Sequence, residues 1–381
     1  MELSVAKLRH HKDFFSHISA IIAFWGITKM KKRFFCVILF FLSFTASAVG
    51  LEFSEVTENS RPKLPDDFYY SKDYRVQWWY LTGHLLDEAG REFGYELTFF
   101  AIGVQKREYK SRFGVRNIYI SHFAVSDVKN MIFLSAESAD AGVFGFAGAA
   151  EKGLEVWVGN NSIKGTQEKM QIRASDKERG IDIDLLLSPA KPVVLHGDAG
   201  YSRKSEESPL IASLYFSYTD LYTHGTLSIG NRTFRVKGKS WFDREISSRG
   251  LEAGERGWDW FSIQLKDERE VMLYLIRKKD GSVDRYSSGT LVYKDGSSRH
   301  LSLPDFKVTV LSHYRSEKTG ARYPSRWQIA IPSENLSLTV TPLIEDQEFQ
   351  GSAITGNNYW EGTCSVTGTA VGRAYVELVG Y

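Results

Sequence analysis

Cysteine is nearly absent from the sequence, which limits how the folded chain can be stabilised. The 381 residues include only two, Cys36 and Cys364. Cys36 lies in an apolar stretch that we expect to be removed with a signal peptide, so Cys364 has no partner for an internal disulfide. Its surroundings, TCSVTG, resemble a strand, and we expect a buried thiol. The stability of the chain must therefore come from its apolar cores.

Helical periodicity is scarce after residue 50, and methionine is rare. The chain has 24 Phe and 19 Tyr against 5 Met, and aromatic side chains pack well on pleated sheets. Strand-like runs alternate with short turns, such as DEAGRE at 87–92, and IDIDLLL at 181–187 alternates cleanly between polar and apolar residues. This rhythm is typical of antiparallel barrels or sandwiches and predicts an all-β fold.

The chain also lacks an excess of either charge. Its formal net charge is +2, but the first 48 residues hold 7 of the 48 basic and 2 of the 46 acidic residues, which leaves 41 basic and 44 acidic residues in the remainder. A chain with nearly balanced charges lacks the excess of basic residues that binds nucleic acid, so no nucleic-acid partner is expected.

Motifs for metal, nucleotide or serine-hydrolase chemistry are missing too. Six histidines follow the N-terminal segment, none in H-x-H or H-E-x-x-H spacing, so we expect no metal site. The Gly/Ala-rich stretch at 140–150 lacks the spacing of a phosphate loop, and no cofactor is expected. Without a G-x-S-x-G elbow, the sequence gives no support to a serine hydrolase.

The N-terminus carries the features of a secretory signal. Met30 to Arg33 is basic, residues 34–44 are apolar, and Ala46 to Ala48 form a small-residue cleavage site. The apolar run is shorter than the roughly 18 residues that span a bilayer. We therefore expect residues 1–48 to be a leader with a signal peptide at 30–48, and no membrane span after cleavage. The expected location is the periplasm or the exterior of a Gram-negative-type bacterium, and the translation start stays open between Met1 and Met30.

Two aromatic stretches of the chain repeat one another. RVQWWYLTGHLL at 75–86 aligns with GWDWFSIQL at 257–265. The matched pairs are Trp78 with Trp258, Tyr80 with Trp260, and His84 with Gln264. Large residues alternate with a period of two in both stretches, which is the pattern of a strand. We interpret the stretches as the opening strands of two related β units.

Further echoes support the same division. GKSWFDRE at 238–245 is echoed by GRAYVELV at 372–379, and LYTHGTLSIG at 221–230 resembles NYWEGTCSVTG at 358–368. They predict two tandem β units. The first is expected at 49–248, with a lead-in arm at 49–68, and the second at 249–381.

Five motifs together resemble one known family. They are, in chain order, RVQWWYLTGHL, SHFAVSD, KSWFDREISS, GWDWFSIQL and AYVELVGY. They are similar to motifs of the two-domain lipocalin-like family that includes carotenoid 1,2-hydratase (hydroxyneurosporene synthase) and AttH-like periplasmic proteins, whose members are often described as predicted secreted hydrolases. The resemblance implies two tandem lipocalin-like antiparallel β-barrels with a cavity the size of a small apolar ligand.

The resemblance leaves two functions open. The first is an exported protein that binds an apolar or amphipathic small molecule, as a periplasmic component whose partners are subunits of an ABC-type transport system. The second is an acid–base hydratase or related lyase of the carotenoid 1,2-hydratase type, acting on an isoprenoid or lipid. In the hydratase branch we expect a histidine near the position that Arg244 occupies in this chain.

KSWFDREISS is the densest candidate for chemistry. On a strand, Trp241, Asp243 and Glu245 share one face, and a carboxyl beside an indole on a partly buried face should have a raised pKa. Such an acid can protonate an alkene while aromatic rings stabilise the cation. In the alternative interpretation, Arg244 pairs with Asp259 or Glu245 and locks the two barrels together.

His122 in ISHFAVSD is either a catalytic residue or a hydrogen-bonded interior histidine. The candidate catalytic residues are accordingly Asp243, Glu245, Asp259 and His122. The candidate ligand-binding residues are Trp78, Tyr80, His84, Trp241, Arg244, Trp258 and Trp260. We expect the carboxyl groups at 243, 245 and 259 to lie together near the seam between the barrels.

Overall fold

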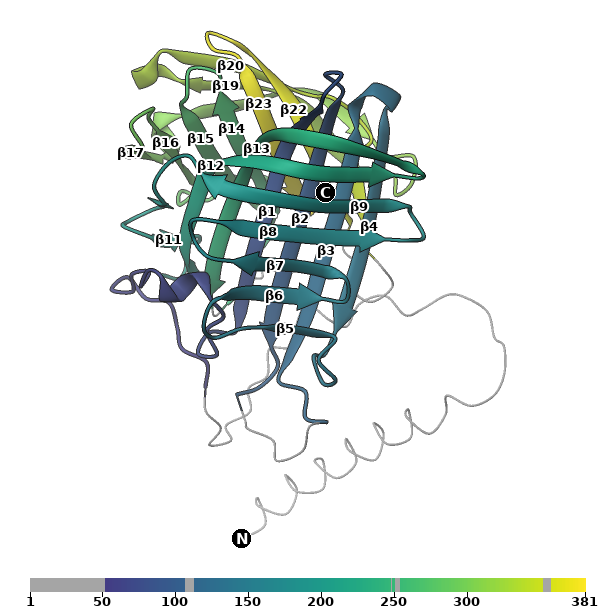
Figure 1. The fold of residues 1–381 in the computed structure, drawn as a ribbon. Helices are drawn as coiled ribbons and strands as arrows, with labels where there is room; N and C mark the ends of the chain where they lie inside the picture. Colours follow the sequence, from purple (N-terminus) through teal and green to yellow (C-terminus); the bar gives the residue numbers. More distant parts are fainter. Residues whose placement is uncertain (1–51, 107–112, 248, 251–253, 352–357) are drawn as a thin grey trace, which may run out of the picture. The chain divides into compact units, whose positions relative to one another are not determined.

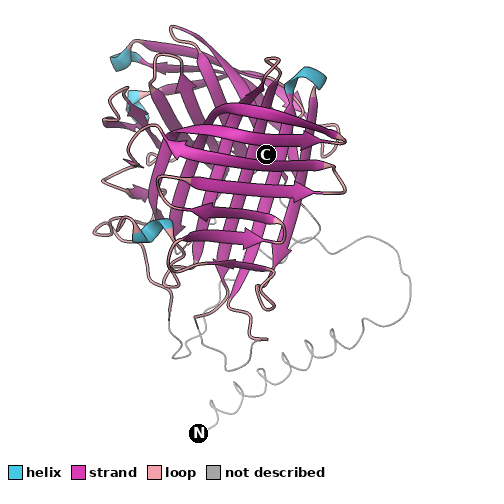
Figure 2. Ribbon diagram, viewed as in Figure 1, coloured by secondary structure: helices cyan, strands magenta, loops and turns pink. Residues whose placement is uncertain are grey.

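The computed structural model describes residues 52–381 except 107–112, 248, 251–253 and 352–357. Within these residues the chain consists mostly of strands joined by turns (Figure 2), which confirms the all-β prediction. The single-turn 3-10 helices are η1 (Asp66–Phe68), η2 (Val128–Asn130), η3 (Leu303–Asp305) and η4 (Pro332–Glu334). No helix in this part of the chain is long and apolar enough to cross a membrane. The predicted signal peptide lies outside the described residues.

The first sheet is antiparallel and folds over its own core. Its strands are β1 (Val76–Asp87), β2 (Glu92–Gly103), β3 (Asn117–Asp127), β4 (Ile132–Asp140), β5 (Ala147–Ala149), β6 (Leu154–Val158), β7 (Asn161–Gly165), β8 (Met170–Asp176), β9 (Ile181–Pro189), β10 (Val194–Leu195), β11 (Tyr201–Arg203), β12 (Ala212–Ile229) and β13 (Arg232–Ser247). Their order is β4-β3-β2-β1-β13-β12-β9-β8-β7-β6-β5, with β10 and β11 also paired to β12. Figure 1 shows β5–β9 crossing β1–β4, as in a curled barrel.

The second sheet repeats this plan in shorter form. Its strands are β14 (Glu255–Leu265), β15 (Glu270–Lys278), β16 (Ser288–Val292), β17 (Ser298–Ser302), β18 (Lys307–Arg315), β19 (Arg322–Ile331), β20 (Leu336–Pro342), β21 (Glu348–Gln350), β22 (Asn358–Gly368) and β23 (Gly372–Val379). Their order is β17-β16-β15-β14-β23-β22-β20-β19-β18, with β21 paired to β22. In both sheets the opening strand lies between its hairpin partner and the last strand, so the two sheets form two tandem barrels.

Strand register confirms one echo and corrects another. Tyr80 pairs with Asp243 and its counterpart Trp260 pairs with Glu377, so GKSWFDRE and GRAYVELV are equivalent. The predicted match of 221–230 with 358–368 is wrong. Ser217 pairs with Asp243 while Glu361 pairs with Glu377, so LYFSYTD at 214–220 is the true counterpart of NYWEGTC. The bulge in β12 between Tyr218 and Leu221 shifts the later residues out of register.

The centre of each barrel is occupied by its own apolar side chains. In the first barrel they include Trp79, Leu81, Phe93, Ile172 and Leu185, all buried. In the second they include Phe261, Ile263, Trp327, Leu338 and Cys364. The thiol of Cys364 is buried and free, as predicted. Tight packing of this kind supplies most of the favourable free energy of folding.

The lead-in arm is part of the first core. Its single-turn helix η1 places Phe68 against Tyr218 and Phe242, with ring centroids 5.5 Å and 6.1 Å apart. The indole Nε1 of Trp79 donates a hydrogen bond to the Phe68 carbonyl oxygen at 2.8 Å. The arm therefore closes one end of the core and does more than lead into the first strand.

The opening strand β1 is buried on both faces. Trp79, Leu81 and Leu85 point into the barrel core, whereas Trp78 and Tyr80 belong to a separate aromatic cluster. That cluster unites Tyr80, Tyr215 and Trp241 of the first sheet with Trp260, Met272, Tyr274, Ile276 and Tyr375 of the second. We call this layer between the two sheets the seam.

Candidate functional site

A row of polar side chains crosses the first sheet on the face that forms the seam. Tyr80 pairs across strands with Thr98 on one side and with Asp243 on the other. The row continues to His122 beyond Thr98 and to Ser217 beyond Asp243. Directly paired residues of neighbouring strands point to the same side of a sheet. All five side chains therefore face the second barrel.

The second sheet carries a matching row. Its members, in order across the sheet, are Glu361, Glu377, Trp260, Tyr274 and Ser288. The two rows meet where the Tyr80 hydroxyl donates a hydrogen bond to Glu361. The rings of Tyr80 and Trp260 also pack edge to face, with centroids 5.1 Å apart. Matched residues of the two opening strands therefore touch across the seam.

Asp243 is the best-connected carboxyl of the seam. Its Oδ2 accepts a hydrogen bond from the Tyr215 hydroxyl at 2.6 Å, and its Oδ1 accepts one from the indole Nε1 of Trp241 at 2.6 Å. The Ser217 hydroxyl also donates to Oδ1. Trp260 extends the network by donating to the Tyr215 oxygen at 3.0 Å. Three donors of the first sheet therefore hold the carboxyl, and Trp260 of the second sheet supports one of them.

Burial raises the pKa of Asp243 to about 7, although the hydrogen bonds from Ser217, Tyr215 and Trp241 oppose the shift. Glu245 repels the ionised form and raises the pKa further. Only 3% of the residue is exposed. A carboxyl that titrates near neutral pH is populated as acid and as base, which is the property that proton-transfer catalysis requires.

A histidine outside the predicted site residues orients this network. His196 Nε2 lies 2.7 Å from the Ser217 oxygen, and its Nδ1 lies 2.8 Å from the Thr290 hydroxyl. Ser217 uses its single hydrogen to bind Asp243, so it must accept its other hydrogen bond from Nε2–H. Burial lowers the pKa of His196 far below the usual value. The ring is therefore neutral and links Asp243 to the second sheet.

Glu245 lies next to Asp243 on the same face and has a cationic partner. The Lys204 ammonium is 3.4 Å from the Glu245 carboxylate. It also lies over the rings of Tyr215 and Tyr274, 4.7 Å and 4.1 Å from their centroids. Burial alone would lower the pKa of Lys204, but Glu245 and Tyr274 raise it above the usual value. The seam thus contains a partly buried lysine whose raised pKa favours the charged form.

Three further carboxyls of the seam have raised pKa values. Burial raises the pKa of Glu96 to about 8 and that of Glu377 to about 7. For Glu361, burial and repulsion from Glu96 raise the pKa well above the usual value. Trp258 donates to Glu377 at 2.8 Å. The far half of the seam is therefore a second acidic cluster, beside the Asp243 network.

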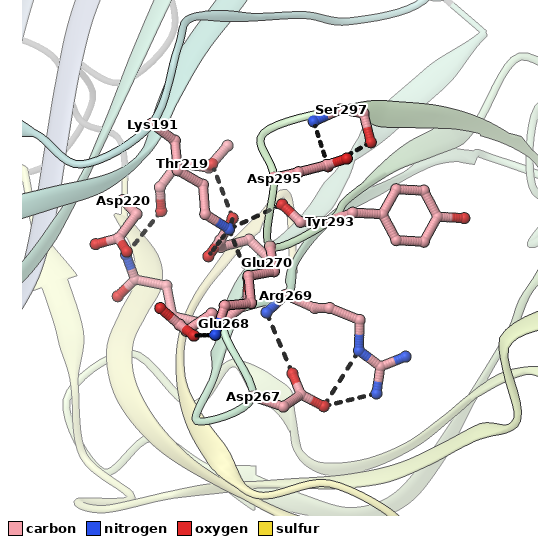
Figure 3. Close-up of polar contacts among 12 residues, drawn as sticks. Lys191, Thr219, Asp220, Asp267, Glu268, Arg269, Glu270, Tyr293, Asp295 and Ser297 are labelled. Atoms are coloured by element: carbon pink, nitrogen blue, oxygen red, sulfur yellow. Dashed lines mark hydrogen bonds and ion pairs between the residues drawn. The ribbon is translucent and has the colours of Figure 1, made fainter.

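A separate ion pair joins the two sheets at the edge of the seam. Figure 3 shows Lys191, from the connection after β9, bound to Glu270 of β15, with Nζ–Oε2 2.8 Å. Lys191 also donates to the carbonyl oxygens of Glu268 and Tyr293, at 2.5 Å and 3.0 Å, and Thr219 donates to Glu270 at 3.2 Å. Burial raises the pKa of Glu270 to about 7, against the opposing effect of Lys191. This lysine is anchored by four oxygens of the second sheet.

The neighbourhood of that ion pair contains an open surface hollow. Its lining consists of Asp267, Arg269, Tyr293, Lys294 and Asp295. None of these is a predicted site residue. Across the described part of the chain, no group of three or more His, Cys, Asp or Glu side chains could hold a metal ion.

The profile of the family described as AttH-like matches residues 55–381. The chain belongs to the AttH-like family. This confirms the resemblance that the five motifs indicate. No curated protein matches the sequence.

Two solved structures share the fold of this AttH-like chain. A crystal structure of AttH from Nitrosomonas europaea has a TM-score of 0.78 and 28% identity, and the match covers 86% of this chain and 99% of that one. Kievitone hydratase from Nectria haematococca has a TM-score of 0.65 and 16% identity, with 87% and 97% covered. The AttH-like family and these neighbours share with this chain a fold of two lipocalin-like barrels.

Most of the predicted site residues of this AttH-like chain meet at the seam. Trp241, Asp243 and Glu245 share one face, as the strand alternation predicts. Tyr80, Trp260, Trp78 and Trp258 belong to the same aromatic cluster. His84 lies at one end, where its Nδ1 is 2.8 Å from the Thr363 hydroxyl of the second sheet. Burial lowers the pKa of His84 to about 3, so the ring is neutral.

The prediction that Asp259 joins Asp243 and Glu245 is wrong. Asp259 lies between Trp258 and Trp260 in β14, so its side chain points to the opposite face of the strand. It pairs with Arg277 at 2.8 Å and accepts a hydrogen bond from the Tyr381 hydroxyl at 2.8 Å. Asp259 therefore belongs to a separate ion pair of the second barrel.

Arg244 does not lock the barrels together, contrary to the alternative interpretation. It points into the first barrel, where its guanidinium lies 4.0 Å from the Trp79 ring centroid. Its NH groups donate to the carbonyl oxygens of Asp67 and Tyr69, at 3.0 Å and 2.7 Å, and to Gln77 Oε1 at 2.8 Å. The arginine fastens the lead-in arm, and the ion pairs that join the two sheets include Lys191 with Glu270 and Arg373 with Glu92.

His122 lies at the far end of the polar row. Its Nδ1 is 2.8 Å from the Tyr359 hydroxyl of β22, and its Nε2 is 3.2 Å from Glu137. The ring stacks on Phe349, with centroids 4.4 Å apart. The histidine thus connects the two sheets beyond the second acidic cluster.

Proposed function

We propose that this protein is an acid–base enzyme that adds water to, or removes it from, a carbon–carbon double bond in an apolar small molecule. The observation that carries the proposal is Asp243, a buried carboxyl with a pKa of about 7 in an aromatic layer. A hydratase needs an acid that is still protonated near neutral pH, and an exposed Asp with its usual pKa of about 4 is ionised there.

Asp243 is the proton donor in this reaction. Its O–H proton passes to one alkene carbon, where the π electron pair forms the new C–H bond, and the other carbon becomes cationic. Trp241 and Tyr215 bind the carboxyl through their N–H and O–H groups, and Trp260 packs against Trp241. A cation that forms over the face of one of these rings is stabilised by it. Water then captures the cation and loses a proton, so the net change is addition of H and OH.

His196 and Ser217 are positioning residues for this acid. Ser217 holds Oδ1, and neutral His196 fixes the Ser217 hydroxyl. In this proposal the barrels must separate locally before a substrate can reach Asp243, because the residue is buried. An apolar substrate suits this layer, since its lining consists mainly of aromatic rings.

The comparisons support an enzyme of this class. Kievitone hydratase, by its name, hydrates kievitone, so the two-barrel fold is compatible with water addition. At 16% identity the likeness extends to the fold alone. The substrate proposed for this chain, an apolar alkene such as an isoprenoid or a lipid chain, rests on the aromatic lining of the seam.

A carrier function is the second candidate. In this proposal the exported chain holds an apolar or amphipathic molecule in the periplasm and passes it to the subunits of an ABC-type transporter. The aromatic seam between two linked barrels suits such a ligand as well as a substrate. A carrier, however, has no need of a carboxyl whose pKa is near 7.

Both candidates are tested with the protein purified after export. Co-purifying lipids are identified by mass spectrometry, and the protein is incubated with acyclic terpenoid alkenes and unsaturated fatty acids. We expect a hydrated product that disappears in Asp243→Asn. Bound lipid without turnover of any alkene would instead favour the carrier.

A further inference from the structure

Two carboxyl oxygens buried in the seam receive no hydrogen bond from the described residues. Glu96 in β2 and Glu361 in β22 each accept one hydrogen bond at Oε1, from Thr98 and Tyr80 respectively. Their Oε2 atoms are buried without a partner, and the residues are 0% and 1% exposed. A buried polar atom that lacks a partner costs about 1–3 kcal/mol. Two such atoms in one layer therefore indicate a bound polar group.

The two carboxyls come from opposite sheets and interact with each other. Repulsion from Glu96 is the largest electrostatic contribution to the raised pKa of Glu361. Neither Glu96 nor Glu361 forms an ion pair within the described part of the chain. Arg373, the cation nearest in sequence to Glu361, instead binds Glu92 at 2.9 Å. Since the charge of Glu96 raises the pKa of Glu361, Glu96 ionises first, near pH 8, and the pair then holds a single proton.

A water molecule suits this pair better than a metal ion. Water can accept a hydrogen bond from the protonated Oε2 of the neutral carboxyl and donate one to the Oε2 of the ionised carboxyl, and it needs little space. The described residues provide no group of three ligands for a metal. The pair also lies in the same layer as Asp243, because Tyr80 binds Glu361 and is the cross-strand partner of Asp243.

We propose that Glu96 and Glu361 bind the water molecule that the reaction adds or releases, and that their carboxylate exchanges a proton with it. This inference rests on the proposed function. Asp243 supplies the proton that forms the C–H bond, and a lone pair of the bound water forms the C–O bond. The proton that leaves this water passes to the ionised member of the pair. Tyr80 binds Glu361 and neighbours Asp243 in the sheet, and return of the proton from the pair to Asp243 restores the starting state.

High-resolution crystallography of the wild-type protein tests the water site without any substrate. We expect an ordered water within hydrogen-bonding distance of both Oε2 atoms, and loss of that water in Glu361→Leu. A direct hydrogen bond between the two carboxyls, or an empty space between them, would overturn the inference. Glu155→Gln, at an exposed position of β6, is the matched control that leaves the seam unchanged.

Turnover in D₂O separates the roles of the carboxyls. With an alkene that the wild type hydrates, Glu361→Gln should lose hydration by about 10²–10⁴-fold but still exchange deuterium into the alkene through Asp243. Asp243→Asn should lose both reactions. Equal loss of exchange and hydration in Glu361→Gln, or full hydration by it, would contradict the role of the pair. If the wild type hydrates no alkene, the proposed function fails, and the crystallographic result alone decides whether the pair binds water.

Discussion

Asp243 in β13 and Glu377 in β23 occupy the same position in the two copies of the repeat. Asp243 is the cross-strand partner of Tyr80, and Glu377 is the partner of Trp260, its counterpart. Burial raises the pKa of each carboxyl to about 7. The duplication therefore places two equivalent titratable groups in the layer where the barrels meet.

The first prediction compares the effects of removing the carboxyl of Asp243, which lies in the seam, and that of Asp259, which lies on the other face of β14. Asp243→Asn should lower kcat by about 10²–10⁴-fold, the usual contribution of a general acid. Asp259→Asn should leave kcat unchanged and lower the melting temperature, because Asp259 pairs with Arg277 on the opposite face of β14. Steady-state kinetics and thermal melts of both variants are the measurements. A loss of kcat in Asp259→Asn with normal folding would contradict the site.

The second prediction concerns stability against pH. The pKa values of Asp243, Glu96 and Glu377 are higher in the folded chain than the usual 3.8 or 4.5 and reach about 7, 8 and 7. The folded state therefore binds protons more tightly than the unfolded state. The contribution of these carboxyls to the unfolding free energy is complete below their pKa in the unfolded chain. It is lost as pH rises from about 4 to about 8.

Urea denaturation between pH 5 and pH 9 measures this effect. Each carboxyl contributes a decrease in unfolding free energy of up to about 1.4 kcal/mol per pH unit within its window. Glu96→Gln should have a smaller decrease than the wild type, whereas the exposed-site variant Glu155→Gln should follow the wild type. Parallel curves for all three proteins would contradict the raised pKa of Glu96.

The third prediction concerns the ion pair between the sheets. Lys191→Met leaves Glu270 buried without its cation, and breaking a buried pair in this way costs about 3–5 kcal/mol. The double variant Lys191→Met/Glu270→Leu removes both charges and should recover most of the lost stability. Chemical denaturation of the two variants provides the comparison. If the double variant is as unstable as the single one, the pair does not act as we describe.

The fourth prediction concerns Arg244. Its guanidinium binds the carbonyl oxygens of Asp67 and Tyr69, so Arg244→Met should leave these acceptors unsatisfied and destabilise the first barrel by about 2–5 kcal/mol. The pH dependence of turnover should stay the same, because Arg244 points away from the seam. A shifted pH profile in a folded Arg244→Met protein would show that this residue acts on the site.

The fold could be predicted from the sequence because its repeat is carried by large side chains. Trp78 and Tyr80 match Trp258 and Trp260 in a period-2 pattern, and both opening strands have the predicted position. The match of 221–230 with 358–368 was wrong because it aligned Tyr222 with Tyr359, whose counterpart by strand register is Tyr215. Pairing with β13 is a long-range property, so only the structure supplies that register.

The candidate site was predicted in part. Trp241, Asp243 and Glu245 were found because they cluster in one short motif. Glu96 and Glu361 were missed because each stands among apolar and small residues without a further acid beside it, and the sequence does not show that this face is buried by a second barrel. Glu377 did have a signal, since GRAYVELV aligns it with Asp243. Asp259 was placed on the wrong face of its strand. It lies between Trp258 and Trp260 in β14, so its side chain points away from the face that carries theirs.

The pKa of Asp243 is the most direct test of the account. It can be measured by difference infrared spectroscopy of the protonated carboxyl against pH, with Asp243→Asn as the reference. We predict a midpoint near pH 7, in line with a pKa of about 7, and a signal that is absent from the variant. A midpoint near the usual value of about 4 would contradict the central claim that Asp243 is the acid of the seam.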